Sequence, residues 1–137
     1  MVNYNLDSSV VIDILRGYNG MEQRMIDEVN AGNVISICSI VYYEVARGFE
    51  RSGNNRKLEK FYKLYKDANH LYFDANNLDA VYKAIEIYEN LPRGVTIEDA
   101  DIFIAAAAIV NKCTLVTSNV RHFSRVAGLN FVNWRLP

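Results

Sequence analysis

Short runs of apolar and β-branched residues alternate with helical segments along this chain, and no other feature constrains the fold as much. The strand-like runs are residues 2–6, 33–38, 70–73, 114–117 and 130–132. Apolar spacings of three and four residues, together with N-cap and glycine stop signals, predict helices at residues 8–17, 21–31, 39–51, 54–67, 77–91 and 96–111. This order predicts an α/β fold, in which a mainly parallel sheet of about four to five strands is covered by helices on both faces.

At 137 residues the chain can bury a core as a single domain, residues 1–137. Its two cysteines, Cys38 and Cys113, stand far apart in apolar contexts, which favours buried reduced thiols. No apolar run approaches the roughly 20 residues that span a bilayer, and the first residues lack the pattern of a signal peptide. We therefore expect a cytoplasmic protein with no membrane association.

Charged residues are unevenly distributed, although the formal net charge is only -1. All 16 Asp and Glu lie within residues 1–101. Residues 102–137 contain no acid, and their basic residues are Lys112, Arg121, Arg125 and Arg135. This segment would suit phosphate groups. Residues 51–66 are also basic, but there a solvated helix face is the simpler explanation.

Local signals indicate where two helices begin. Ser39 is a plausible N-cap for the helix at residues 39–51. Thr96 and Asp99 have the spacing of a capping box, which would open the Ala-rich helix. Most acidic residues fall among polar neighbours on helix faces, and we assign these, Asp13 included, to solvent.

Asp101 is an acid within an apolar helix stripe. Its spacing places it on one helix face with Ile97, Ile104, Ala105 and Ala108. A carboxylate there should point toward the core or its rim, which indicates a functional role. The alternative is an acid that stabilises the helix N-terminus, but that role better suits the two acids of the first turn.

Glu44 and Asp7 also occupy unusual positions. Glu44 shares a helix face with Val41 and Val45, where a lone carboxylate is costly unless it is paired or bound to metal. The alternative for Glu44 is a buried ion pair, for example with Arg47. Asp7 lies between the first strand and the first helix, so it is either a plain N-cap or a site residue at the carboxyl edge of the sheet.

Three such carboxylates with no His or Cys among them would form a hard oxygen site. Mg²⁺ or Mn²⁺ suits that ligand set, whereas zinc does not. A divalent cation would remove the repulsion between the acids, bind a phosphate and lower the pKa of a bound water. The pattern therefore predicts metal-assisted hydrolysis of phosphate esters.

Four segments contain the residues of interest: residues 3–17 with Asp7, residues 39–48 with Glu44, residues 97–106 with Asp101, and residues 115–123 with Asn119. In order and spacing they resemble PIN-domain ribonucleases, specifically the VapC-type toxins of toxin–antitoxin modules. The resemblance covers nearly the whole chain. It implies a PIN-like three-layer α/β/α sandwich and a magnesium-dependent endoribonuclease.

The resemblance also implies roles for individual residues. Asp7, Glu44 and Asp101 would bind the metal ion, and Asn119 would be a fourth catalytic residue that ligates through its carbonyl oxygen or through water. A turn residue is the alternative for Asn119. The family often has another acid just after this position, where this chain has Arg121 and His122. We interpret His122 as a surface residue, with a phosphate contact as the alternative.

The partners implied by the resemblance are an RNA substrate, a small antitoxin protein and a second copy of the chain in a homodimer. Five aromatic residues could form a hydrophobic groove or belong to the core: Tyr42, Tyr43, Phe61, Tyr62 and Tyr65. A non-catalytic PIN-like RNA-binding or scaffold module is the alternative function. A phosphatase is a third hypothesis, but Ser9 occupies the place where that chemistry usually has a second Asp.

Overall fold

The computed structural model describes residues 1–72 and 78–135 and contains a five-stranded sheet in the order β3-β2-β1-β4-β5. All neighbouring strands pair in parallel. The strands are β1 (Asn3–Leu6), β2 (Val34–Cys38), β3 (Asn69–Leu71), β4 (Thr114–Val116) and β5 (Phe131–Val132). The helices are α1 (Ser8–Arg16), α2 (Met21–Asn30), α3 (Ser39–Ser52), α4 (Asn55–Asp67), α5 (Asp79–Glu89), α6 (Asp99–Val110) and α7 (Val120–Phe123).

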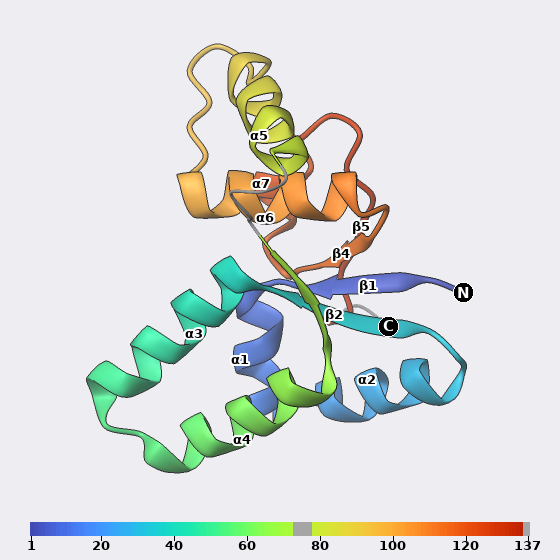
Figure 1. Ribbon diagram of the computed structural model, residues 1–137, viewed down its shortest axis with the longest axis vertical. Helices are drawn as coiled ribbons and strands as arrows, with labels where there is room; N and C mark the ends of the chain where they lie inside the picture. The colour runs from blue at the N-terminus through green and yellow to red at the C-terminus, as the bar shows by residue number, and fades with distance from the viewer. Residues whose placement is uncertain (73–77, 136–137) are drawn as a thin grey trace.

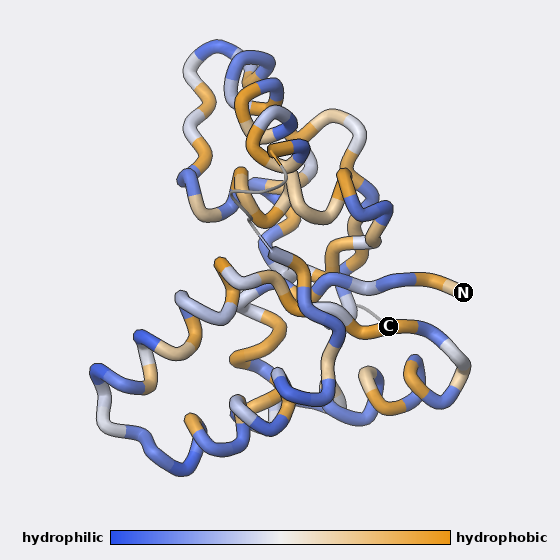
Figure 2. Tube along the Cα trace, in the orientation of Figure 1, coloured by the Kyte–Doolittle hydropathy of each residue, from blue (hydrophilic) through white to orange (hydrophobic). Residues whose placement is uncertain are grey.

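The helices form a layer on each face of the sheet (Figure 1), which confirms the predicted three-layer α/β/α sandwich. Helices α1 to α4 lie on one side and α5 to α7 on the other. Leu6, Ile37 and Leu115, from three neighbouring strands, are fully buried. The tube along α4 is mostly hydrophilic in Figure 2, because only its inward side, including Leu58 and Phe61, is buried. Among the described residues, no helix is both long enough and apolar enough to cross a bilayer.

The predicted elements lie close to the observed ones, but both predicted N-caps are wrong. Helix α3 is capped by Cys38, and Ser39 is already its first helical residue. Helix α6 begins at Asp99 with Glu98 as N-cap, so Thr96 opens no capping box. Residues 73 and 77, at the ends of a predicted strand and a predicted helix, lie outside the described residues. The short helix α7 had no counterpart in the prediction.

The prediction that Asp13 is solvated is also wrong, because this residue is buried. Only 6% of it is exposed, and its carboxylate accepts two hydrogen bonds from Arg135, at 2.8 Å from Nε and 2.7 Å from Nη2. The Arg135 guanidinium also lies 4.4 Å above the ring of Tyr18. This ion pair ties the last described residue to α1, so Arg135 is not a free cation for phosphate.

Candidate active site

The turns after β1 and β4 lie side by side at the carboxyl edge of the sheet. The two strands are parallel neighbours with Leu6 opposite Val116, and the Asp7 N–H donates to the Val116 carbonyl at 2.9 Å. Ligand sites of parallel sheets lie at this edge. The fold therefore brings Asp7 next to the turn that contains Thr117 and Asn119.

Asp7 serves both as an N-cap and as the centre of a hydrogen-bonded cluster. One carboxylate oxygen accepts from the Ser8 N–H at 2.8 Å, as expected of the cap of α1. The other accepts from the Thr117 hydroxyl at 2.7 Å and the Ser9 hydroxyl at 3.2 Å. With only 5% of Asp7 exposed, these contacts fix a carboxylate that has little access to water.

Glu44 approaches the same cluster from α3. The Ser8 hydroxyl donates to Glu44 Oε1 at 2.6 Å, so Ser8 bonds to both Asp7 and Glu44. Arg47 does not form the ion pair considered from the sequence. Its guanidinium lies 4.8 Å above the Tyr43 ring instead. Within the described residues, Glu44 therefore remains without a basic side chain in ion-pair contact.

Asn119 and His122 link Asp101, on α6, to the cluster. The Asn119 N–H donates to Thr117 Oγ1 at 2.9 Å. The Asn119 amide nitrogen lies 3.0 Å from His122 Nδ1, which in turn lies 3.4 Å from Asp101 Oδ2. One continuous set of polar contacts thus joins Glu44, Asp7, Asn119 and Asp101.

His122 is the residue of this set whose role the sequence interpretation missed. Its side chain is 41% exposed, so it does lie at the surface, but it also contacts a predicted metal ligand. The signal in the sequence was its position three residues after Asn119, on what proves to be a single helical turn.

Burial makes the two aspartates costly to ionise. It is the main cause of the raised pKa of Asp7, to which the charge of Asp101 also contributes, whereas hydrogen bonds from Thr117 and Ser8 lower it. Burial likewise raises the pKa of Asp101, and contact with His122 opposes that shift. No Lys or Arg ion pair compensates either charge within residues 1–72 and 78–135. A bound cation would relieve this penalty.

The donor set fits a hard divalent cation, but the side chains are not yet gathered around one point. In the described part of the chain, no three His, Cys, Asp or Glu side chains are arranged to hold a metal ion as they stand. Ser8 lies between the Asp7 and Glu44 carboxylates. Some movement of these side chains would therefore have to accompany binding of one ion by all three acids.

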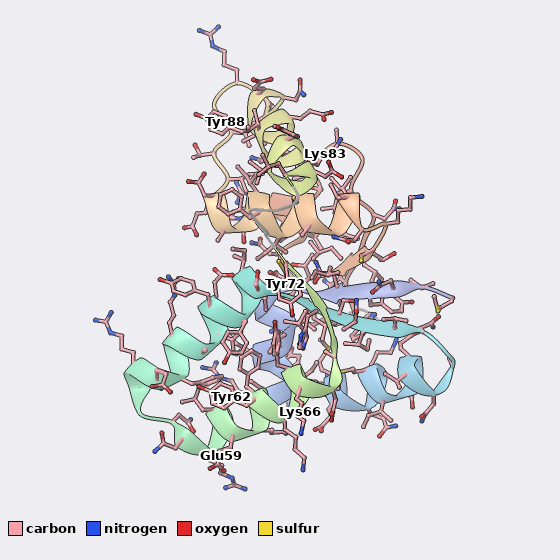
Figure 3. The ribbon with its side chains drawn as sticks, viewed as in Figure 1. Glu59, Tyr62, Lys66, Tyr72, Lys83 and Tyr88 are labelled. Carbon is pink, nitrogen blue, oxygen red and sulfur yellow. The ribbon has the colours of Figure 1, made fainter. Side chains whose placement is uncertain are left out.

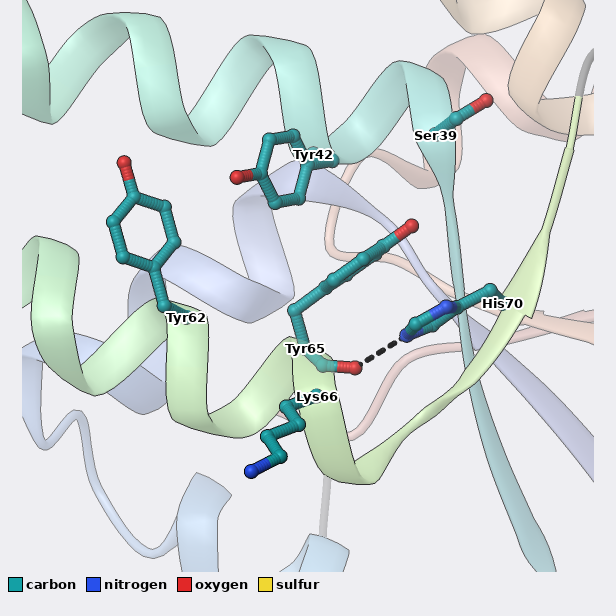
Figure 4. A pocket seen from close by; sticks show the side chains of 6 residues that line it. All are labelled: Ser39, Tyr42, Tyr62, Tyr65, Lys66 and His70. Carbon is teal, nitrogen blue, oxygen red and sulfur yellow. Dashed lines mark hydrogen bonds between the residues drawn. The ribbon is translucent and has the colours of Figure 1, made fainter.

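A separate open cleft lies beside α3 and α4, with a volume of about 460 Å³. Figure 4 shows the side chains that line it: Ser39, Tyr42, Tyr62, Tyr65, Lys66 and His70. The Tyr65 ring stacks on His70 with centroids 4.0 Å apart. Of the five aromatic residues in question, Phe61 belongs to the core and Tyr43 is 60% exposed, so neither the groove nor the core describes the whole set.

Helix α5 carries an exposed stripe of large apolar side chains, Tyr82, Ile85 and Tyr88. They are 63%, 50% and 68% exposed, whereas Ala80, Ala84 and Ile87 of the same helix are buried. Lys83 and Tyr88 extend from α5 at the end of the molecule remote from Tyr62 and Lys66 of α4 (Figure 3). This exposed stripe adjoins a cleft of about 380 Å³ between α5 and α6.

Comparison with known proteins gives consistent results. The PIN domain model matches residues 4–129. Ribonuclease VapC1 of Methanocaldococcus jannaschii is 32% identical over 122 residues, which cover 88% of this chain and 79% of that protein. Ribonuclease VapC2 of Rickettsia felis is 24% identical over 136 residues, covering 96% and 97%. The crystal structure of VapBC2 from Rickettsia felis, bound to a DNA fragment from its promoter, has a TM-score of 0.82 and 25% identity, and covers 97% of this chain and 99% of that chain.

Proposed function

The chain belongs to the PIN-domain family, in its VapC group, and on that premise we propose that it is an endoribonuclease. It would hydrolyse RNA phosphodiester bonds with the aid of a divalent cation, Mg²⁺ or Mn²⁺. One observation carries the proposal. The four residues singled out from the sequence come from four different segments, and a continuous set of polar contacts joins them at the carboxyl edge of the sheet.

In this proposal Asp7, Glu44 and Asp101 hold the cation, and Asn119 contributes its carbonyl oxygen directly or through water. When bound, such a cation polarises a phosphate and lowers the pKa of a water molecule that attacks it. Thr117 donates a hydrogen bond to the Asp7 carboxylate, as outer-shell partners do at metal sites. The buried setting strengthens each of these charge interactions.

The basic C-terminal segment supplies fewer phosphate contacts than its composition suggests. Arg135 is engaged by Asp13. Lys112 precedes β4 and so lies at the opposite edge of the sheet. Arg121 is exposed on α7 next to His122, and we propose that it contacts RNA beside the site.

The test is RNA cleavage by single-residue variants. Asp7→Asn and Asp101→Asn should each lower magnesium-dependent cleavage more than about 100-fold, because each removes a cation ligand while its neutral replacement keeps the shape of the side chain. Asp99→Asn, in the same helix but outside the polar contacts, is the matched control and should cleave like the wild type. Equal cleavage by all four proteins would point to a contaminating nuclease and refute the proposal.

We further propose that the chain is the toxin of a type II pair and that a cognate antitoxin binds it. Support comes from its similarity to a chain of the VapBC2 complex and from its 32% sequence identity to ribonuclease VapC1. Expression in a bacterium should arrest growth, and Asp7→Asn or Asp101→Asn should relieve the arrest. Growth arrest by the variants as well would contradict a toxin that acts through this site.

Two further proposals concern assembly and location. The exposed stripe on α5 supports a homodimer, because a monomer seldom exposes several large apolar side chains on one helix face. A cytoplasmic location and a single domain over residues 1–137 stay predictions. The buried free thiols of Cys38 and Cys113 accord with the first of these.

A further inference from the structure

His122 places a ring nitrogen between two residues assigned to the cation. Its Nδ1 lies 3.0 Å from Asn119 Nδ2 and 3.4 Å from Asp101 Oδ2. The side chains of His122 and Asp101 are 41% and 17% exposed, so the pair borders solvent rather than the sealed core. A cation could therefore reach both residues from outside.

The groups around Nδ1 are of the kinds that bind a metal ion. A ring nitrogen without its proton has a lone pair to donate, and the Asn119 amide presents its oxygen after a half-turn. The Asp101 carboxylate lies close to the same ring nitrogen, so three potential ligands meet in one region.

A divalent cation between Nδ1 and the Asp101 carboxylate would have the ring lone pair and the carboxylate as ligands. The Asn119 amide oxygen would become a third ligand after the half-turn. The separation of 3.4 Å is close to the roughly 3 Å between neighbouring ligands on a six-coordinate ion with bonds of about 2.1 Å.

We propose that His122 Nδ1 is a ligand of the active-site cation and that this nitrogen makes the site prefer Mn²⁺ to Mg²⁺. Imidazole raises the affinity of a site for transition-metal ions, whereas Mg²⁺ strongly favours oxygen ligands. The inference rests on the proposed function, because it assigns a ligand and a cation preference to that same site. It also replaces the all-oxygen ligand set expected from the sequence.

The second histidine provides an internal control. His70 stacks on Tyr65, and its Nε2 lies 2.6 Å from the Tyr65 carbonyl oxygen, far along the chain from the acidic site. The chain has only two histidines. In a His70→Gln variant, His122 is therefore the only possible source of an imidazole ligand.

The decisive experiment is pulsed EPR of Mn²⁺ bound to the untagged protein. Wild type and His70→Gln should show a nitrogen coupling that responds to isotopic labelling of histidine. His122→Gln should bind Mn²⁺ without that coupling, and circular dichroism would verify that it is folded. Persistence of the coupling in His122→Gln, or its absence from His70→Gln, would overturn the inference.

Calorimetric titration provides a second measurement. His122→Gln should weaken Mn²⁺ binding about tenfold or more and change Mg²⁺ binding far less. His122→Glu should move the preference toward Mg²⁺, because it returns the site to oxygen ligands. Mn²⁺ bound by the wild type without a nitrogen coupling would refute the role of His122 and leave the metal-dependent nuclease intact. No binding of either cation by the wild type would refute both proposals.

Discussion

The ion pair between Asp13 and Arg135 should contribute measurably to the stability of the folded protein. Asp13→Ala should lower the free energy of unfolding by about 2 kcal/mol, because it removes two charged hydrogen bonds from Arg135 to a buried carboxylate. Glu86→Ala is the control, since the Lys83–Glu86 pair at 2.9 Å is exposed and should contribute no more than about 0.5 kcal/mol. Urea denaturation would measure both, and equal losses would contradict this assignment.

Asp101 should make the stability of the metal-free protein depend on pH. Burial raises its pKa in the folded state above that of the unfolded chain. The folded protein therefore binds the proton more tightly, and stability is lost as pH rises through the raised pKa. Between about pH 4 and pH 7 in a chelator, the free energy of unfolding of the wild type should fall relative to that of Asp101→Asn.

Only the slope with pH is diagnostic in that comparison. The substitution also changes the absolute stability of the variant, so the comparison uses the change with pH, over which the penalty for ionising Asp101 grows. Parallel stability curves for the two proteins would show that Asp101 ionises in the folded protein as easily as in the unfolded chain. A saturating divalent cation should reverse the trend, because it binds the ionised form.

Helix α6 carries Asp101 but begins without a side-chain cap. Its N-cap, Glu98, has the extended backbone of a capping residue, with φ -62 and ψ 147, yet accepts no cap hydrogen bond. Glu98→Ser should therefore stabilise the protein by about 0.5–1 kcal/mol. Glu89→Ser, at the end of α5, is the control and should give no gain. Thermal denaturation would compare the two, and equal effects would show that the cap is not what limits α6.

Local patterns in the sequence predicted the elements well, because strand and helix periods are properties of neighbouring residues. They also single out Asp7, Glu44 and Asp101 as candidates, and their role as metal ligands stays a prediction. The prediction that Asp101 lies beyond the first turn of its helix is wrong, because α6 begins later than predicted and Asp101 belongs to that turn. Local patterns failed where the partner is distant. Asp13 resembles a solvated acid until the fold brings Arg135, 122 positions away, against it.

Helix α5 shows a second limit. Periodicity reveals which residues share a face but not which face another element covers. Ile85 and Tyr88 are large and apolar, yet they are exposed, whereas Ala80, Ala84 and Ile87 are buried. Small side chains allow close helix packing, and α5 contacts the Ala-rich α6. Because α5 packs through its other face, the exposed stripe is accessible to another molecule.

At the scale of the whole molecule, the sandwich itself assembles the site. Asp7 and Asn119 come from the sheet edge, Glu44 from the helical layer on one side, and Asp101 from the layer on the other. Repulsion between these acids opposes packing of the two helical layers against the sheet edge, and a bound cation would favour that packing. Folding and cation binding should therefore support each other.

The exposed stripe of α5 lets the proposed homodimer be tested without touching the site. Ile85→Glu should convert a dimer to a monomer in analytical ultracentrifugation, because it places a charge at the centre of a face that would be buried on association. Ile26→Glu is the matched control: this α2 residue is 40% exposed, lies outside the stripe, and should leave the dimer intact. A wild type that sediments as a monomer at all concentrations would refute the dimer. Dissociation by both variants would show that general destabilisation, rather than the α5 face, is responsible.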